Sequence, residues 1–142
     1  VQSRVPIVIG GGGPKRTPAL AARFATEFNA PFVPRDFFVT QTDRVRAACE
    51  AIDRDPSTMT FSVALVLCCG SDEAEVGRRA AAIGREPAEL RQNGAAGTPD
   101  EVAATLRAWN EAGAARIYLQ VLDLADLDHL DLVAESVAPV LA

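Results

Sequence analysis

The chain has 142 residues, of which 49% are hydrophobic and 23% are charged, proportions typical of one globular domain with a substantial core. Its 14 basic and 19 acidic residues give a net charge of −5, which repels phosphate backbones and anionic lipid, so nucleic acid and membranes are not expected partners. No apolar run approaches the ~20 residues of a membrane span, and we expect a single cytoplasmic domain over residues 1–142.

The first predicted unit is a strand at residues 7–9 followed by a helix that begins at Thr17. The strand is apolar without alternation, as in a parallel sheet covered on both faces. The Thr17 hydroxyl is a typical helix cap, and Pro18 suits the first helical position because its missing N–H costs nothing there. Leu20 and Phe24 are four residues apart, so we expect both to face the core.

The second predicted unit has a very short strand at residues 26–29 and a helix at about residues 42–52. The intervening residues 30–40 contain two prolines, and this irregular segment is a candidate active-site loop. The helix carries one apolar stripe at the i, i+3, i+4, i+7 spacing of a buried face. Its members are Val45, Ala48, Cys49 and Ile52.

The third predicted unit begins with residues 61–69, an almost wholly apolar run that we expect to be a central strand. A helix at residues 72–83 with Ser71 as its cap follows, then a helical turn at residues 87–93. A strong helix signature comes next, with Thr98 as cap, Pro99 in the first position and Glu101 three residues after the cap. The side chains expected to face the core are Val76, Ala80, Ile83, Val102, Leu106 and Trp109.

The fourth predicted unit is a strand at residues 116–122, with Tyr118 packed, and a helix at residues 128–137. Leu130, Val133 and Val137 are its expected inner side chains. The alternation of strands and helices implies an α/β fold with a parallel sheet, either open or part of a barrel. A complete barrel takes about 250 residues, so we predict four βα units that form half of a TIM (β/α)8 barrel.

Four consecutive glycines at residues 10–13 separate the first strand from the first helix. Without Cβ atoms the backbone N–H groups can approach a phosphate closely, and the start of a helix favours an anion. Lys15 and Arg16 add positive charge there in an otherwise acidic chain. A structural turn needs only one or two glycines, so phosphate binding is favoured. Lys15 follows Pro14, so the glycine-lysine ending of the nucleotide-triphosphate loop is absent, and Lys15 also takes the place of the third glycine of the dinucleotide fingerprint.

Three segments together resemble the C-terminal part of luciferase-like oxidoreductases, in the branch that depends on the deazaflavin coenzyme F420. They are PIVIGGGGPKRTPALAARFATEFN at residues 6–29, SVALVLCCGSDEAEVGRRAAAIGREPAEL at residues 62–90, and GTPDEVAATLRAWNEAGAARIYLQVLDLADLDHLDLV at residues 97–133. Members of this superfamily are (β/α)8 barrels, so the resemblance implies that the four units are the fifth to eighth. It also implies hydride transfer between coenzyme F420, or FMN as the alternative, and an organic substrate.

The resemblance implies cofactor-binding residues as well. The family's glycine-rich segment lies against the phosphate end of the flavin or deazaflavin, and this role passes to Gly10, Gly11, Gly12 and Gly13. Asn29 is the last residue of the segment EFN, at a position where relatives usually have a sequence similar to DGWN. Lys15, Arg16 and Thr17 are further candidates for cofactor binding, because they place two positive charges and a hydroxyl group next to the glycines. No catalytic residue is assigned, because in relatives much of the ring-binding and proton-handling apparatus comes from the N-terminal half.

Half a barrel would leave an apolar interior and two unpaired strand edges. Besides a small-molecule substrate, we therefore expect a protein partner, either the missing N-terminal half-barrel or a second copy of the chain. The alternative functions are a non-catalytic half-barrel that serves as an association or phosphate-binding module, and an open α/β sheet that binds a phosphorylated small molecule.

His129 is the single histidine of the chain and has acidic neighbours. One imidazole among scattered carboxylates is a weak metal motif, so we expect Asp126 or Asp128 to cap the last helix and no metal site. Asp123 and Asp126 follow a strand, where a substrate contact is a second interpretation. The three cysteines, an odd number with an adjacent pair, are expected to be buried reduced thiols: Cys49, Cys68 and Cys69.

Overall fold

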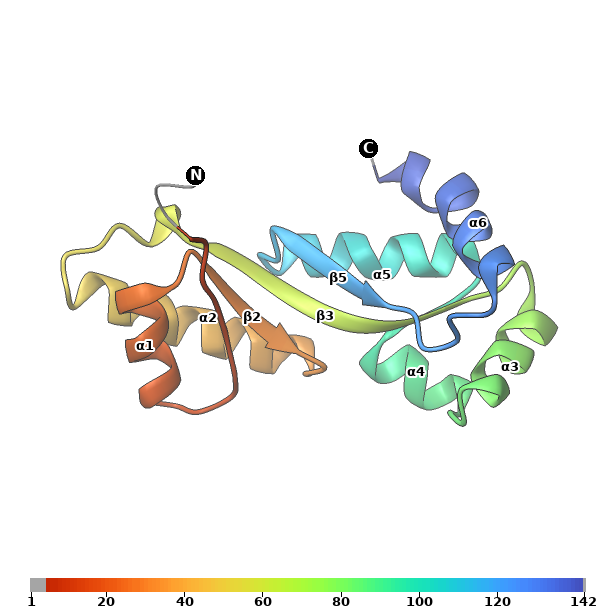
Figure 1. The fold of residues 1–142 in the computed structure, drawn as a ribbon, viewed down its shortest axis with the longest axis horizontal. Coiled ribbons are helices and arrows are strands. Elements are labelled where there is room, and N and C mark those ends of the chain that lie inside the picture. Colours follow the sequence, from red (N-terminus) through yellow and green to blue (C-terminus); the bar gives the residue numbers. More distant parts are fainter. Residues whose placement is uncertain (1–4, 142) are drawn as a thin grey trace. The chain divides into compact units, whose positions relative to one another are not determined.

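The structure is a computed structural model that describes residues 5–141. Strands and helices largely alternate along the chain (Figure 1), and the strand pairs of known register are parallel, which confirms the α/β class with a parallel sheet. The described residues form five strands, not the predicted four. The strand that was missed has only three residues, Ala95, Ala96 and Gly97, too few to show a periodic pattern. No described helix is long and apolar enough to cross a membrane.

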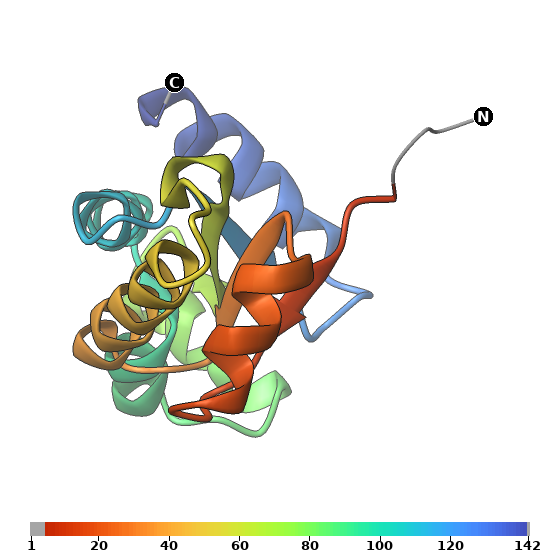
Figure 2. The ribbon, with the colours of Figure 1, turned by 90° about the vertical axis from the view of Figure 1, so that its left-hand side faces the viewer.

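The chain divides into two compact units, Val1–Ala64 with Ala112–Ile117, and Leu65–Glu111 with Tyr118–Ala142. In the first unit α1 (Arg16–Phe24) packs against β1 (Val8–Gly10) and α2 (Arg35–Glu50) (Figure 2). Gly10 pairs with Asn29, and Asn29 pairs with Ser62, so these residues lie side by side across the sheet. The elements of this unit are β1 (Val8–Gly10), α1 (Arg16–Phe24), β2 (Glu27–Pro31), α2 (Arg35–Glu50) and the first half of β3 (Thr60–Cys69).

The helix α2 begins at Arg35, well before the predicted start at residue 42. Most of the segment proposed as an irregular active-site loop is therefore helix, and that prediction is wrong. Pro34 is the residue just before the helix, where a proline is compatible with helix initiation, so it did not mark a loop. Ile52 lies beyond the last helical residue and is 48% exposed, whereas Val45 and Cys49 are buried as predicted.

The start of α1 also differs from the prediction. The helix begins at Arg16, with Lys15 as its N-cap residue and no side-chain cap, so Thr17 is not the cap. Pro18 consequently occupies the third helical position, where an N–H still has no partner within the helix.

The buried face of α1 consists of small residues. Ala21 and Ala22 are fully buried, while Leu20 and Phe24, the expected core residues, are 44% and 47% exposed. Small side chains let the helix lie close to its neighbours. The end of α1 is capped from outside the helix, because Arg54 donates to the carbonyl oxygen of Ala22 at 2.9 Å.

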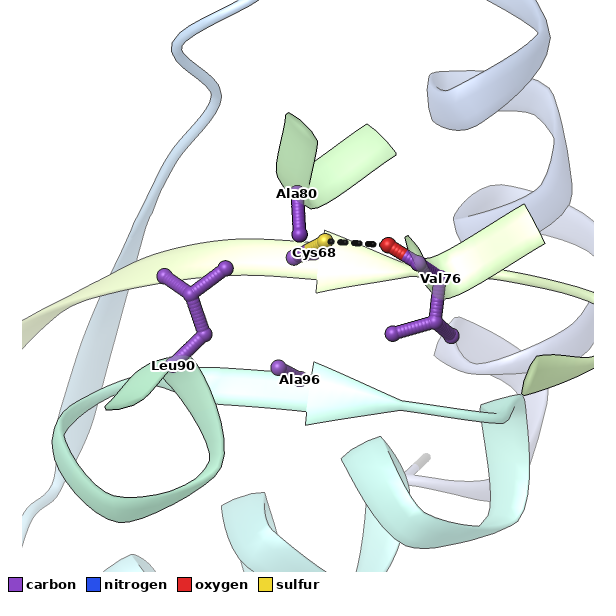
Figure 3. Close-up of a cluster of buried hydrophobic side chains, with 5 residues drawn as sticks. All are labelled: Cys68, Val76, Ala80, Leu90 and Ala96. Carbon is purple, nitrogen blue, oxygen red and sulfur yellow. Dashed lines mark hydrogen bonds between the residues drawn. The ribbon is translucent and has the colours of Figure 1, made fainter. Parts of the chain in front are cut away.

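The second unit contains the end of β3, which pairs with the short strand β4 (Ala95–Gly97). Leu67 lies opposite Ala95, and Cys69 lies opposite Gly97. Its core includes a cluster of Cys68, Val76, Ala80, Leu90 and Ala96 (Figure 3), in which the Cys68 thiol donates to the Val76 carbonyl oxygen at 3.6 Å. Its further elements are α3 (Glu73–Ala82), α4 (Pro87–Asn93), β4 (Ala95–Gly97), α5 (Pro99–Glu111) and α6 (Leu127–Ser136); β5 (Arg116–Gln120) passes from the first unit into the second.

The helix α5 (Pro99–Glu111) begins at the predicted residue and buries the predicted face. The Glu101 carboxylate accepts from the Thr98 amide at 2.8 Å, as in a capping box. Val102, Leu106 and Trp109 are all buried.

Three smaller predictions in this unit are wrong. Asp72, not Ser71, caps α3, because its carboxylate accepts from the Glu75 amide at 2.9 Å. Tyr118 is 43% exposed, since the exposure of β5 alternates along the strand. Leu130 is 46% exposed.

Gly70 follows β3 at a point with no room for a side chain. A Cβ there would lie 2.5 Å from the Val76 amide nitrogen and 3.0 Å from the Asp72 carbonyl oxygen, so the backbone would have to move. We expect Gly70→Ala to lower the free energy of unfolding by about 1–3 kcal/mol. Gly77 in α3 has nothing near its Cβ position, so Gly77→Ala should instead be stabilising by about 0.5–1 kcal/mol. Urea unfolding of both variants checks this pair, and equal effects would contradict it.

Candidate functional site

Gly10 is the last residue of β1, and Gly11, Gly12 and Gly13 lie between this strand and α1. Gly11 has a φ of +131°, a conformation that residues with a Cβ rarely adopt. Within residues 5–141, the amides of Gly12 and Gly13 make no backbone hydrogen bond. Two N–H groups are thus available beside the N-terminus of a nine-residue helix, where an anion is stabilised.

The side chains nearest this segment come from α1 and α2. A Cβ on Gly13 would lie 3.1 Å from Thr17 Oγ1, and one on Gly12 would lie 3.2 Å from the Phe37 ring. Thr17 is half-buried and places its hydroxyl beside the glycines, although it does not cap the helix. Lys15 and Arg16 are exposed at the helix start and supply positive charge there.

Gln41 of α2 also lies beside the glycine segment, and the sequence did not indicate it. Its side chain is 1% exposed, and its Nε2 atom is buried with no hydrogen-bond partner among the described residues. This Nε2 lies 3.8 Å from the Cβ position of Gly12. An unpaired donor in such a place costs about 1–3 kcal/mol relative to a paired one.

Asn29 lies next to the glycines through its pairing with Gly10. Its side-chain amide donates to Ser62 Oγ at 2.9 Å, and Ser62 in turn donates to the buried carboxylate of Glu27 at 2.6 Å. Arg116 pairs with the other oxygen of Glu27. The Asn29 amide group is therefore held in place by a polar chain that also ties β2 to β3.

A second polar cluster lies in the other unit, around Arg79. Arg79 is 5% exposed and donates to Asp126 Oδ2 at 2.9 Å and to the Cys69 carbonyl oxygen at 2.8 Å. His129 Nε2 accepts from the Cys69 amide at 2.9 Å, which requires this ring nitrogen to be unprotonated. Asp126 accepts from the His129 amide, so it is the predicted cap of α6.

The pKa values in this cluster follow from these contacts. Hydrogen bonds from Arg79 lower the pKa of Asp126 to about 2. Burial lowers the pKa of His129, and the charge of Arg79 lowers it further. Burial also raises the pKa of Cys69 to about 11. The cluster thus holds a neutral imidazole and an unreactive thiol, which suits a structural role at the end of β3.

A small pocket in this unit is lined by Asp123, Asp126 and His129 among others. Within residues 5–141 no group of three or more His, Cys, Asp or Glu side chains could hold a metal ion. The three cysteines are free and buried.

The chain matches one protein-family model and several solved structures. The family model described as luciferase-like monooxygenase matches residues 1–88, which include the glycines, Asn29 and Gln41. No curated protein matches the chain.

Several solved structures share the fold. An F420-dependent secondary alcohol dehydrogenase in complex with an F420-acetone adduct has a TM-score of 0.81 and 14% identity, over 99% of this chain and 50% of its own. The coenzyme F420-dependent tetrahydromethanopterin reductase from Methanopyrus kandleri has a TM-score of 0.77 and 14% identity, over 97% of this chain and 51% of its own.

A third similar structure is a type II Baeyer-Villiger monooxygenase, the oxygenating constituent of 3,6-diketocamphane monooxygenase from Pseudomonas putida in complex with FMN. Its TM-score is 0.66 at 18% identity, over 94% of this chain and 48% of its own. The chain therefore spans about half the length of these structures, which confirms the expected half of a (β/α)8 barrel fold.

Proposed function

The chain belongs to the luciferase-like monooxygenase family, and from this we propose that it is part of an oxidoreductase that binds its cofactor's phosphate on the glycine segment, residues 10–13. The reaction is hydride transfer between coenzyme F420, with FMN as the alternative, and an organic substrate. The bound cofactor supplies the hydride chemistry.

The observation that carries the proposal is the open backbone after β1. The amides of Gly12 and Gly13 are without backbone acceptors within residues 5–141, and the Thr17 hydroxyl lies close to Gly13. A buried amide donor, Gln41 Nε2, also faces this place. A phosphate fits this set because its oxygens accept hydrogen bonds from several donors at once. The chain's own part is to fix the anionic end and so orient the cofactor.

The other predicted residues surround this position. Lys15 and Arg16 supply charge, Thr17 a hydroxyl group, and Asn29 a side chain fixed next to Gly10. The proposal assigns these residues a binding role and names no catalytic residue.

The choice between the two cofactors rests on charge. Coenzyme F420 carries an acidic tail, so the exposed cations beside its phosphate should favour it over FMN. We expect the double variant Lys15→Gln/Arg16→Gln to weaken F420 binding by about tenfold, and FMN binding by less. Fluorescence titration of the full-length protein with each cofactor measures both constants. Arg23→Gln, which removes an exposed cation at the other end of α1, is the control.

Two outcomes would change the conclusion. If the wild-type full-length protein binds neither cofactor, the oxidoreductase proposal fails and the association or phosphate-binding module is favoured. If the double variant weakens FMN binding more than F420 binding, FMN becomes the preferred cofactor.

A protein partner is part of the proposal, because the chain spans about half of the similar structures. Exposed apolar side chains are consistent with such a partner: Val8 is 55% exposed and Leu124 is 81% exposed. The partner is the N-terminal half-barrel or a second copy. The free thiols of the three cysteines favour a reducing, cytoplasmic location.

A further inference from the structure

The buried amide group of Gln41 has a fixed orientation. Its Oε1 atom accepts a hydrogen bond from Arg44 Nη1 at 3.2 Å. Since a guanidinium group only donates, the oxygen must face Arg44, and the NH₂ group must point the other way. The direction of Nε2 is therefore set by chemistry as well as by packing.

The NH₂ group points to the glycine segment. Its nitrogen lies 3.8 Å from the Cβ position of Gly12, beside the Phe37 ring. It has no acceptor among the described residues although the Gln41 side chain is 1% exposed. Buried donors are almost always satisfied in folded proteins, so we expect an acceptor for Nε2 outside the described residues, and a ligand oxygen at the glycine segment would supply one.

We propose that Gln41 Nε2 donates a hydrogen bond to the phosphate oxyanion held by the amides of Gly12 and Gly13. This inference rests on the proposed function and extends it to a residue from the following βα unit. The Gln41 amide adds a neutral donor from α2 to the backbone donors at the start of α1. Arg44 acts as a positioning residue, because it holds the Gln41 amide in the donating orientation.

The test uses Gln41→Met, which keeps the length of the side chain and removes its donor. In the full-length protein, the dissociation constant for coenzyme F420, measured by fluorescence titration, should rise about tenfold, as expected for a lost hydrogen bond to a charged group. FMN is titrated in parallel. The midpoint of thermal unfolding without cofactor should stay the same or rise, because an unsatisfied buried donor has been removed.

A second variant and a matched control sharpen the test. Gln41→Glu keeps the shape and replaces the donor by an acceptor, so it should weaken binding more than Gln41→Met does. Gln92→Met makes the same change at an exposed glutamine in α4 and should alter neither binding nor the unfolding midpoint.

The outcomes separate this inference from the proposed function. If the wild-type protein binds a cofactor and Gln41→Met binds it equally well, the role of Gln41 is rejected and the glycine site stands. If Gln41→Met lowers the unfolding midpoint by several degrees, the amide is a structural group and the inference is also rejected. If the wild-type protein binds neither cofactor, both proposals fail.

Discussion

Replacement of Arg79 by methionine is expected to lower the free energy of unfolding by about 3–5 kcal/mol. The Arg79 guanidinium is buried and donates to Asp126 and to the Cys69 carbonyl oxygen. Its loss leaves a carboxylate that is 11% exposed and a backbone carbonyl at the end of β3 without their partner. Urea unfolding followed by circular dichroism measures the change.

Arg78 offers a matched control, because it also pairs with Asp126, at 3.3 Å, but its side chain is 58% exposed. A solvent-exposed ion pair contributes about 0–1 kcal/mol, so Arg78→Met should have a small effect. The prediction is wrong if the two variants are equally destabilised.

The Arg79 cluster also predicts coupling between distant positions in the chain. Once Arg79 is gone, the Asp126 carboxylate no longer has its main partner, and Asp126→Asn should then cost little more. The double variant should therefore lose less stability than the sum of the two single variants.

The parts of the fold that the sequence predicted are those with local, periodic signals. The capping box at Thr98 and Glu101 lies within one helical turn, and the apolar stripe of α5 repeats over several turns. The strand β4 has three small residues and no period, so only its pairing with β3 defines it. The buried face of α1 was misjudged because alanines, and not the larger Leu20 and Phe24, pack against the neighbouring elements.

In the candidate site, too, the features with a local sequence signal were predicted and those that depend on packing were not. The four glycines are consecutive, so the sequence alone identifies them as a candidate site, because glycine allows a backbone to approach another group closely. Gln41 carries no local signal: it lies within a helix that was predicted to begin at residue 42, and its relation to Gly12 depends on how α2 packs. The chain of Asn29, Ser62 and Glu27 was missed for the same reason, since it joins two strands.

Replacement of Gly12 by valine is expected to weaken cofactor binding by about a hundredfold, equivalent to ~2.7 kcal/mol. Its Cβ would lie 3.2 Å from the Phe37 ring and 3.8 Å from Gln41 Nε2, so the two added methyl groups would fill the place where the donors converge. Gly12 is exposed and its φ is outside the region that strains other residues, but the Phe37 ring has to shift to admit the new side chain, so the unfolding midpoint of the variant is compared with that of the wild type.

Side chains of increasing size at position 12 test whether the loss of binding is caused by side-chain volume. Gly12→Ala adds one carbon and should weaken binding by about tenfold, between wild type and Gly12→Val. Gly77→Ala, in a helix with open space around it, should leave binding unchanged. Fluorescence titration with coenzyme F420 and with FMN gives the constants, and unfolding midpoints show whether the fold is retained. Binding that persists undiminished in Gly12→Val would show that the phosphate does not lie on the glycine segment, because no anion can occupy the volume of a valine side chain.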